Sequence, residues 1–164
     1  MSVFAAPTVN GYKRFRPYSF APDRVTWAVE NRGALVRVQG APGDTSSHVE
    51  MRIGEPAANP YFYLASNVAA GLDGIRRGVA PPPPVTADPY TAEAPALPAS
   101  LAEAVDALEA DEFYRHEFGS TLVDYLVMMK RFELGRCNDA LAAVAGAEDQ
   151  DVSDWEMREY FEFF

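Results

Sequence analysis

The chain of 164 residues is 48% hydrophobic and 12% aromatic, so it is long enough and apolar enough to fold around a core. Its formal net charge of −10 argues against nucleic acid or an anionic membrane surface as partners. The single cysteine, Cys137, excludes an internal disulfide and indicates a reducing cytoplasm, and the sequence shows neither a signal peptide nor a membrane-spanning stretch.

The charge is unevenly distributed along the chain. Residues 1–78 hold nine Lys/Arg and six Asp/Glu, a net charge of +3, whereas residues 79–164 hold five and eighteen, a net charge of −13. We therefore expect the functional site in the basic first half and a solvated outer layer of helices in the acidic second half.

A loop is predicted over residues 7–22, because prolines and a glycine interrupt any regular pattern there. Long loops in compact domains are often functional. Three β-strands are predicted next, at residues 25–30, 34–38 and 48–53. We expect them to form an antiparallel or mixed sheet. In the third strand, His48, Glu50 and Arg52 share one polar face, and apolar residues occupy the other, as in a half-buried strand.

The second half of the chain is predicted to be mostly helical. Asn59 followed by Pro60 indicates the start of a helix over residues 61–77, which we expect to be largely buried because most of its side chains are apolar. A proline-rich connector follows at residues 79–99. Further helices are predicted at residues 101–109 and 120–135, with a short helix or turn at residues 113–118 between them. Residues 140–145 could extend the helix over 120–135 or follow it, and Ser153 caps a last helix.

Arginines recur through the first half of the chain, at positions 14, 16, 24, 32, 37 and 52. Glu50 lies two residues before the last of them, on the same face of the predicted strand. Arginine binds carboxylate and phosphate oxygens, and a carboxylate supplies hard oxygen to Mg²⁺, so the pattern indicates a site for anionic substrates and a divalent metal. The alternative is that these charges are solvated or paired with neighbouring acids, as charges on strands commonly are.

Several linked patches of sequence carry a resemblance to a known family. They are residues 7–15 (PTVNGYKRF), 21–22 (AP), 31–32 (NR), 49–52 (VEMR), 56–61 (PAANPY), 70–75 (AGLDGI) and 154–156 (DWE). In order and spacing they resemble the C-terminal half of the glutamine synthetase catalytic domain, or of a γ-glutamylamide synthetase-like member of that family.

The resemblance implies an α+β fold, with a few antiparallel strands followed by several helices. Residues 1–164 would form part of a catalytic domain, without the family's N-terminal domain and first catalytic half, which carry most of its metal ligands. The implied division is residues 7–57 for the loop and strands of the site, 58–78 for a helix, 79–99 for the connector and 100–164 for the helical part.

The resemblance also implies a chemistry. Glutamine synthetases use ATP to phosphorylate the γ-carboxylate of glutamate, and ammonia then displaces phosphate while Mg²⁺ or Mn²⁺ ions hold the anions. By position, the implied roles are Arg14 and Arg52 for glutamate, Arg32 and Arg37 for the transferred phosphate and ATP, His48 for the nucleotide side, and Glu50 for a metal ion. Arg32 is the expected catalytic residue.

Three positions bear on the acceptor, the nucleotide side and the regulation that the resemblance implies. Phe20 lies at the flap position where the family carries a glutamate that helps deprotonate ammonium, which puts the use of ammonia in doubt. His48 replaces an arginine and is mostly neutral at pH 7. Tyr90 lies where some bacterial members carry a tyrosine that is adenylylated, but its surroundings differ, and a plain surface tyrosine is the preferred interpretation.

Three functions therefore remain open. The first is part of an ATP-dependent glutamate–ammonia ligase of nitrogen metabolism, and the second is a γ-glutamylamide synthetase that uses an organic amine. The third is a non-catalytic fragment or assembly element. The expected partners are glutamate with ammonia or an amine, and either further copies in a homo-oligomer or a complementing N-terminal segment, in the cytoplasm.

Overall fold

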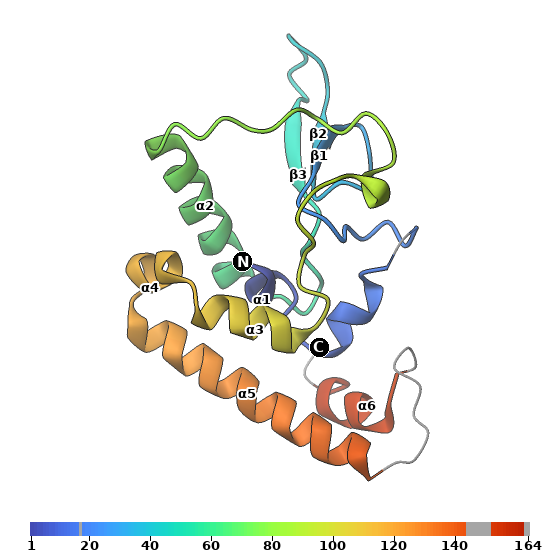
Figure 1. Ribbon diagram of the computed structural model, residues 1–164, viewed down its shortest axis with the longest axis vertical. Coiled ribbons are helices and arrows are strands. Elements are labelled where there is room, and N and C mark those ends of the chain that lie inside the picture. The colour runs from blue at the N-terminus through green and yellow to red at the C-terminus, as the bar shows by residue number, and fades with distance from the viewer. Residues whose placement is uncertain (17, 144–151, 163–164) are drawn as a thin grey trace.

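The computed structural model describes residues 1–16, 18–143 and 152–162. Figure 1 shows a layer of helices on one side of the molecule and a small sheet on the other. In chain order the elements are α1 (Ser2–Ala5), the 3₁₀-helix η1 (Asn10–Arg14), β1 (Trp27–Val29), β2 (Val36–Gln39), β3 (His48–Met51), α2 (Pro60–Arg76), the 3₁₀-helix η2 (Pro89–Thr91), α3 (Leu101–Glu109), α4 (Glu112–Phe118), α5 (Ser120–Ala142) and α6 (Asp154–Tyr160).

The strands form one mixed sheet in the order β1-β2-β3, which confirms the expected α+β class. β2 and β3 are antiparallel, whereas β1 and β2 are parallel. Parallel neighbouring strands usually need a long crossover connection. Here β1 is so short that residues 30–35 suffice to return the chain to the level where β1 began, and β2 then runs in the same direction. Glu30 begins this reversal with a left-handed φ of 55°.

The third strand is less buried than its alternating pattern predicts. Val49 is exposed, Met51 is only partly buried against the core, and full burial on the apolar face is reached at Ile53, just beyond the strand. A small cluster of Ala5, Leu35 and Ile53 attaches the sheet to α1. The polar side chains of β3 therefore stand on a strand that is fixed at one end.

The main core lies between α1 and the helices α3, α4 and α5. Phe4 of α1 packs edge-on against Tyr114 and Phe118, with ring centroids 5.2 Å and 5.8 Å apart. The buried residues of α3 are those of its predicted apolar face, Leu101, Ala104, Val105 and Leu108. The N-terminal residues thus bind the helical layer and the sheet to one another.

α2 begins as predicted, but the expectation that it is largely buried is wrong. The side-chain oxygen of Asn59 accepts hydrogen bonds from the backbone N–H groups of Tyr61 and Phe62, at 3.0 Å and 3.3 Å. Beyond this cap an apolar stripe faces outward, and Tyr61 and Ile75 are 82% and 78% exposed. The helix packs against α1 near its start, where the ring centroids of Phe62 and Phe4 are 6.5 Å apart. The described residues leave its other side uncovered.

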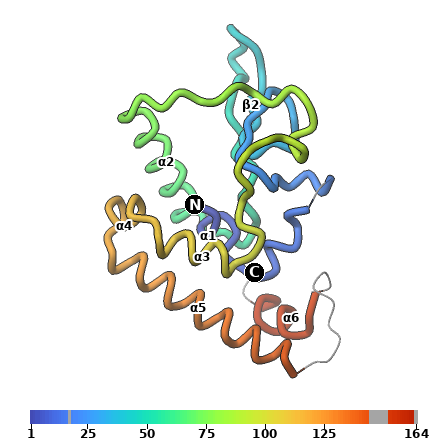
Figure 2. The backbone as a smooth tube through the Cα atoms, viewed as in Figure 1, coloured from blue at the N-terminus to red at the C-terminus, as the bar shows by residue number. Residues whose placement is uncertain are grey.

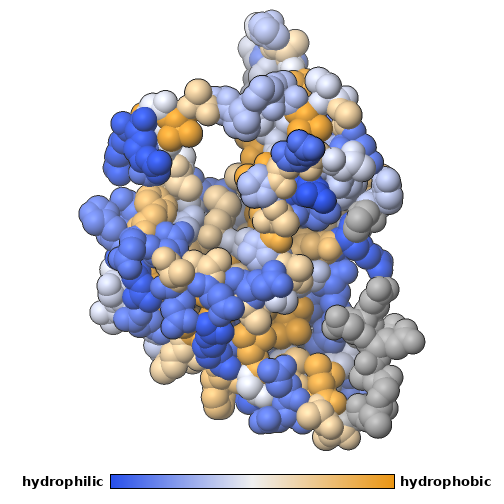
Figure 3. All heavy atoms as spheres, viewed as in Figure 1, coloured by the Kyte–Doolittle hydropathy of each residue, from blue (hydrophilic) through white to orange (hydrophobic). Residues whose placement is uncertain are grey.

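The connector 79–99 is mostly extended, as predicted, apart from the 3₁₀-helix η2 at Pro89–Thr91, and it arches from the end of α2 to the sheet (Figure 2). It pairs with the β1 side, where the Val85 N–H donates to the Trp27 carbonyl at 2.9 Å and the Trp27 indole donates to the Pro82 carbonyl at 2.6 Å. The space-filling view shows an opening beneath this arch, between α2 and the sheet (Figure 3).

The last two helices follow expectations from the sequence. α5 continues through Gly135 to Ala142, so residues 140–142 extend this helix, which is one of the two alternatives left open for that segment; no proline stops the helix earlier. α6 begins at the predicted cap, and Ser153 and Glu156 form a complete capping box. Among residues 1–16, 18–143 and 152–162, no helix is long and apolar enough to cross a bilayer.

Candidate active site

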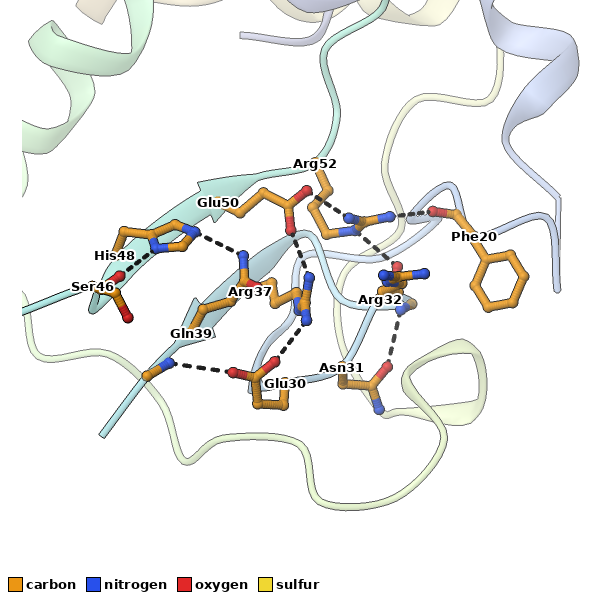
Figure 4. A network of polar contacts seen from close by, with 12 residues as sticks. Phe20, Glu30, Asn31, Arg32, Arg37, Gln39, Ser46, His48, Glu50 and Arg52 are labelled. Carbon is orange, nitrogen blue, oxygen red and sulfur yellow. Dashed lines mark hydrogen bonds and ion pairs between the residues drawn. The ribbon is translucent and has the colours of Figure 1, made fainter. Parts of the chain in front are cut away.

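The candidate site is built on the facing side chains of β2 and β3 (Figure 4). The antiparallel register places Arg37 directly opposite Glu50. Glu50 accepts from both neighbouring arginines, with its Oε1 2.8 Å from Arg52 Nη1 and its Oε2 3.4 Å from Arg37 Nη1. Arg37 also donates to Glu30, at 2.6 Å. The result is one chain of alternating charges along the sheet.

The arginines set the protonation state of the carboxylates. Partial burial alone would raise the pKa of Glu50, but the hydrogen bonds and charge of Arg52 and then Arg37 outweigh it, so the pKa is lowered. The pKa of Glu30 is lowered first by the N–H of Gly40 and then by Arg37. Both carboxylates are therefore ionised at neutral pH.

Arg52 connects the sheet to the loop that carries Phe20. Its Nε donates to the carbonyl of Arg32 at 2.9 Å, and its Nη2 donates to the carbonyl of Phe20 at 3.0 Å. Figure 4 shows the Phe20 ring pointing away from the charged network. Phe20 is 65% exposed and has a left-handed φ of 60°, so a strained turn presents an aromatic ring at the edge of the site.

Tyr90 of η2 supports the same loop. Its hydroxyl donates to the carbonyl of Ala21 at 3.2 Å, and its ring lies 5.5 Å from that of Tyr18. The side chain is half-buried, and burial is the main reason that the pKa of its hydroxyl is raised. Tyr90 is therefore a packing residue of the flap loop in this chain.

The two arginines expected at glutamate and phosphate have different surroundings. Arg32 is exposed, and within the described parts of the chain its guanidinium makes no hydrogen bond or ion pair. Arg14, at the end of η1, is held more firmly. Its Nη2 donates to the carbonyls of Ile53 and Gly54, and its guanidinium lies 4.6 Å from the centre of the Phe15 ring. Burial lowers the pKa of Arg14.

His48 stands at the exposed end of the network. Its Nδ1 lies 2.7 Å from the carbonyl of Ser46, and its Nε2 lies 2.8 Å from the side-chain nitrogen of Gln39. A ring that donates from Nδ1 and accepts at Nε2 satisfies both contacts. The imidazole therefore extends the polar face of β3.

Two carboxylates in these surroundings were missed by the sequence analysis. Glu30 pairs with Arg37, and the signal that could have indicated it is its position at the end of the strand beside β2. Glu55 lies under the loop of Arg14, where its Oε1 accepts from the Thr8 hydroxyl at 3.0 Å. Burial is the main cause of the raised pKa of Glu55.

The metal-binding capacity of the described residues is small. They contain no group of three or more His, Cys, Asp or Glu side chains that could hold a metal ion. Magnesium prefers octahedral coordination by oxygen, so Glu50 could supply one ligand but not a complete site.

The comparisons with known proteins show the family of this chain. Residues 1–160 match the family model for the glutamine synthetase catalytic domain. The chain belongs to the glutamine synthetase family.

Its relatives include proteins named as glutamine synthetases and proteins named as synthetases of γ-glutamylamides. The chain is 50% identical to a γ-glutamylanilide synthase of an Acinetobacter species, 37% to a γ-glutamylethanolamide synthetase of Streptomyces coelicolor and 35% to a glutamine synthetase of Pyrococcus abyssi, in each case over 98% of this chain. Those alignments cover 32%, 32% and 38% of the three relatives.

A solved structure described as a GmaS/ADP complex has the same fold. It superposes with a TM-score of 0.72 at 30% identity, covering 98% of this chain and 36% of the solved chain. The chain thus spans about a third of the length of the proteins that it matches.

Proposed function

We propose that this chain supplies the C-terminal part of the active site of an ATP-dependent ligase that joins the γ-carboxyl of glutamate to ammonia or an amine. The observation that carries the proposal is the network of Arg37, Glu50 and Arg52 on one face of the sheet. Fixed cations around one carboxylate suit a site where phosphate groups, a substrate carboxylate and a metal ion meet.

Each predicted residue has a role in this proposal. Arg14 and Arg52 bind glutamate, Arg32 contacts the transferring phosphoryl group, Arg37 and His48 lie on the ATP side, and Glu50 ligates one divalent ion. Mg²⁺ or Mn²⁺, when bound, would neutralise the phosphate oxygens of ATP. The exposed guanidinium of Arg32 supports its role, because no partner among the described residues competes with an incoming anion for it.

The acceptor is either ammonia or an organic amine. Ammonia is the acceptor in glutamine synthetases, and the 35% identical relative bears that name. The exposed ring of Phe20 favours the second candidate, since an aromatic surface can pack against an amine substituent or hold a cationic amine. Two relatives named for anilide and ethanolamide products support the same reading.

The proposal requires more polypeptide than residues 1–164 provide, since Glu50 alone cannot hold the metal ions. Either a complementing N-terminal segment or neighbouring copies in a homo-oligomer would supply the remaining carboxylates. In this view residues 7–57 carry the site and residues 100–164 form its helical support, in a cytoplasmic enzyme. A purely structural role in assembly is the competing function.

A fusion protein tests the proposal. Residues 1–164 replace the matching third of the Acinetobacter γ-glutamylanilide synthase, and phosphate release from ATP is measured with glutamate and each acceptor. We expect turnover by the fusion and none by the 164-residue chain alone. Arg32→Met should abolish turnover, whereas the matched control Arg77→Met, on the exposed end of α2, should not. A well-folded but inactive fusion would support the structural role instead.

A further inference from the structure

The turn that carries Arg14 is held on two of its faces by different parts of the chain. η1 is a 3₁₀-helix, in which side chains three residues apart lie above one another. Asn10 and Lys13 therefore share one face, and Gly11 and Arg14 share the next. The contacts made by these two faces are separate.

The first face binds the last described helix. Oε1 of Glu156 accepts from the Asn10 side-chain nitrogen at 3.0 Å, and its Oε2 accepts from Lys13 Nζ at 2.7 Å. The same Oε2 accepts the N–H of Ser153 at 2.7 Å, which ties the carboxylate to the start of α6. Glu156 is only 3% exposed, so these bonds form in surroundings where water competes poorly.

A second contact runs parallel to the first. The hydroxyl of Tyr160, one turn further along α6, accepts from the N–H of Val9 at 3.0 Å and donates to Glu133 of α5 at 2.5 Å. α6 is therefore anchored to the long helix α5 while it holds the start of η1. This makes α6 a fixed support for the turn.

The second face of η1 contacts the segment that leads out of β3. Arg14 donates to the carbonyls of Ile53 and Gly54, and the Glu55 carboxylate fills the space where a side chain at Gly11 would lie. The direction of the Arg14 guanidinium thus depends on the rotation of η1 about its axis. Glu156 fixes that rotation from the opposite side.

We propose that Glu156 is a positioning residue that holds η1, through Asn10 and Lys13, in the rotation that aims Arg14 at its anionic ligand. The inference rests on the proposed function, in which that ligand is the carboxylate of glutamate. Glu156 touches neither the sheet network nor Phe20 in the contacts described above, so its effect on catalysis is transmitted through Arg14.

The test in the fusion protein compares the two sides of the Glu156 contact. Glu156→Gln and Lys13→Met should each raise KM for glutamate by about tenfold, because each removes a charge-assisted hydrogen bond. Neither should change KM for ATP, and the double variant should be no worse than the more affected single one. The matched control is Arg136→Met, which removes the ion pair between α5 and Glu159 of α6 but leaves the hydrogen bonds of Glu156 to Asn10, Lys13 and Ser153 in place. It should lower the Tm without raising KM for glutamate.

A second measurement does not depend on catalysis. In the 164-residue chain the N–H of Gly11 donates to the Thr8 hydroxyl at 3.0 Å, a bond that contains no residue of α6. If Glu156 positions the whole turn, Glu156→Gln should speed hydrogen exchange at Gly11 as well as at Val9. An inactive fusion that shows this change would refute the proposed function but not the positioning. Unchanged exchange at Gly11, equal increases in KM for glutamate and ATP, or an equally raised KM in Arg136→Met would overturn the positioning.

Discussion

Arg37 on β2 lies directly opposite Glu50 on β3 and forms a salt bridge with it. Arg37 also forms a salt bridge with Glu30, which lies on the β1 side of β2. One guanidinium therefore bridges two carboxylates, Glu50 on β3 and Glu30 just after the end of β1. An arrangement of this kind fixes the direction of charged groups more than it stabilises the fold, because all of these side chains remain in contact with water.

Glu50→Gln separates these two effects. The amide keeps the shape of the side chain but loses the negative charge that would meet a metal ion. We expect the fusion protein to lose at least about a hundredfold in kcat/KM, a loss typical of removing an electrostatic catalytic group, while its Tm is nearly unchanged. Glu30→Gln is the control on the other side of Arg37. Equal losses in both variants would mean that the metal role assigned to Glu50 is wrong.

Phe20→Glu tests the choice of acceptor. A carboxylate attracts ammonium and can take a proton from it, whereas the ring of Phe20 offers an apolar surface. We expect the fusion protein with Phe20 to prefer an alkyl, aromatic or polyamine acceptor over ammonia, and the Glu variant to shift toward ammonia. The measurement is kcat/KM for each acceptor in both forms. If ammonia is already the better acceptor with Phe20 in place, the amine reading is refuted.

The apolar stripe on α2 should make the isolated chain associate or precipitate. The stripe includes Tyr61, Leu64, Val68, Leu72 and Ile75, all exposed. Exposed apolar patches of this kind usually belong to an interface. Light scattering of the 164-residue chain should show species larger than a monomer, and Leu64→Glu with Ile75→Lys should reduce them. A monodisperse monomer with a cooperative melt would count against this expectation.

The stability of the chain should fall in mild acid because of Glu156. Burial alone would raise the pKa of Glu156, but hydrogen bonds from Lys13, Ser153 and Asn10 outweigh it, and the pKa is lowered. A carboxylate with a lowered folded-state pKa adds stability above its unfolded value, and this contribution is lost as the pH falls through the folded value.

We therefore expect the Tm of the unaltered chain to decline below roughly pH 4.5, near the pKa of an unfolded glutamate, and Glu156→Gln to reduce that decline. The comparison is a Tm series through the acid range, with Glu162→Gln, at an exposed side chain, as the control. Parallel curves for the unaltered chain and Glu156→Gln would show that Glu156 makes no such contribution.

Features that depend on neighbouring residues were predictable from the sequence, and features that depend on distant ones were not. The caps at Asn59 and Ser153 are local, and both form as predicted. The burial of α2 was wrongly predicted, because apolar periodicity shows which face seeks a partner but not whether the chain supplies it. The pairs of Arg37 with Glu30 and of Thr8 with Glu55 depend on how strands and loops meet in space.

The contact between η1 and α6 also has a consequence for biosynthesis. The N–H of Val9 and the hydroxyl of Tyr160 belong to residues 151 positions apart, so the support of the Arg14 turn can form only after the polypeptide between them has been made. Contacts of such long sequence separation are slow to close. A nascent chain still on the ribosome would thus carry its arginines without their final orientation, and premature termination before α6 would leave them so.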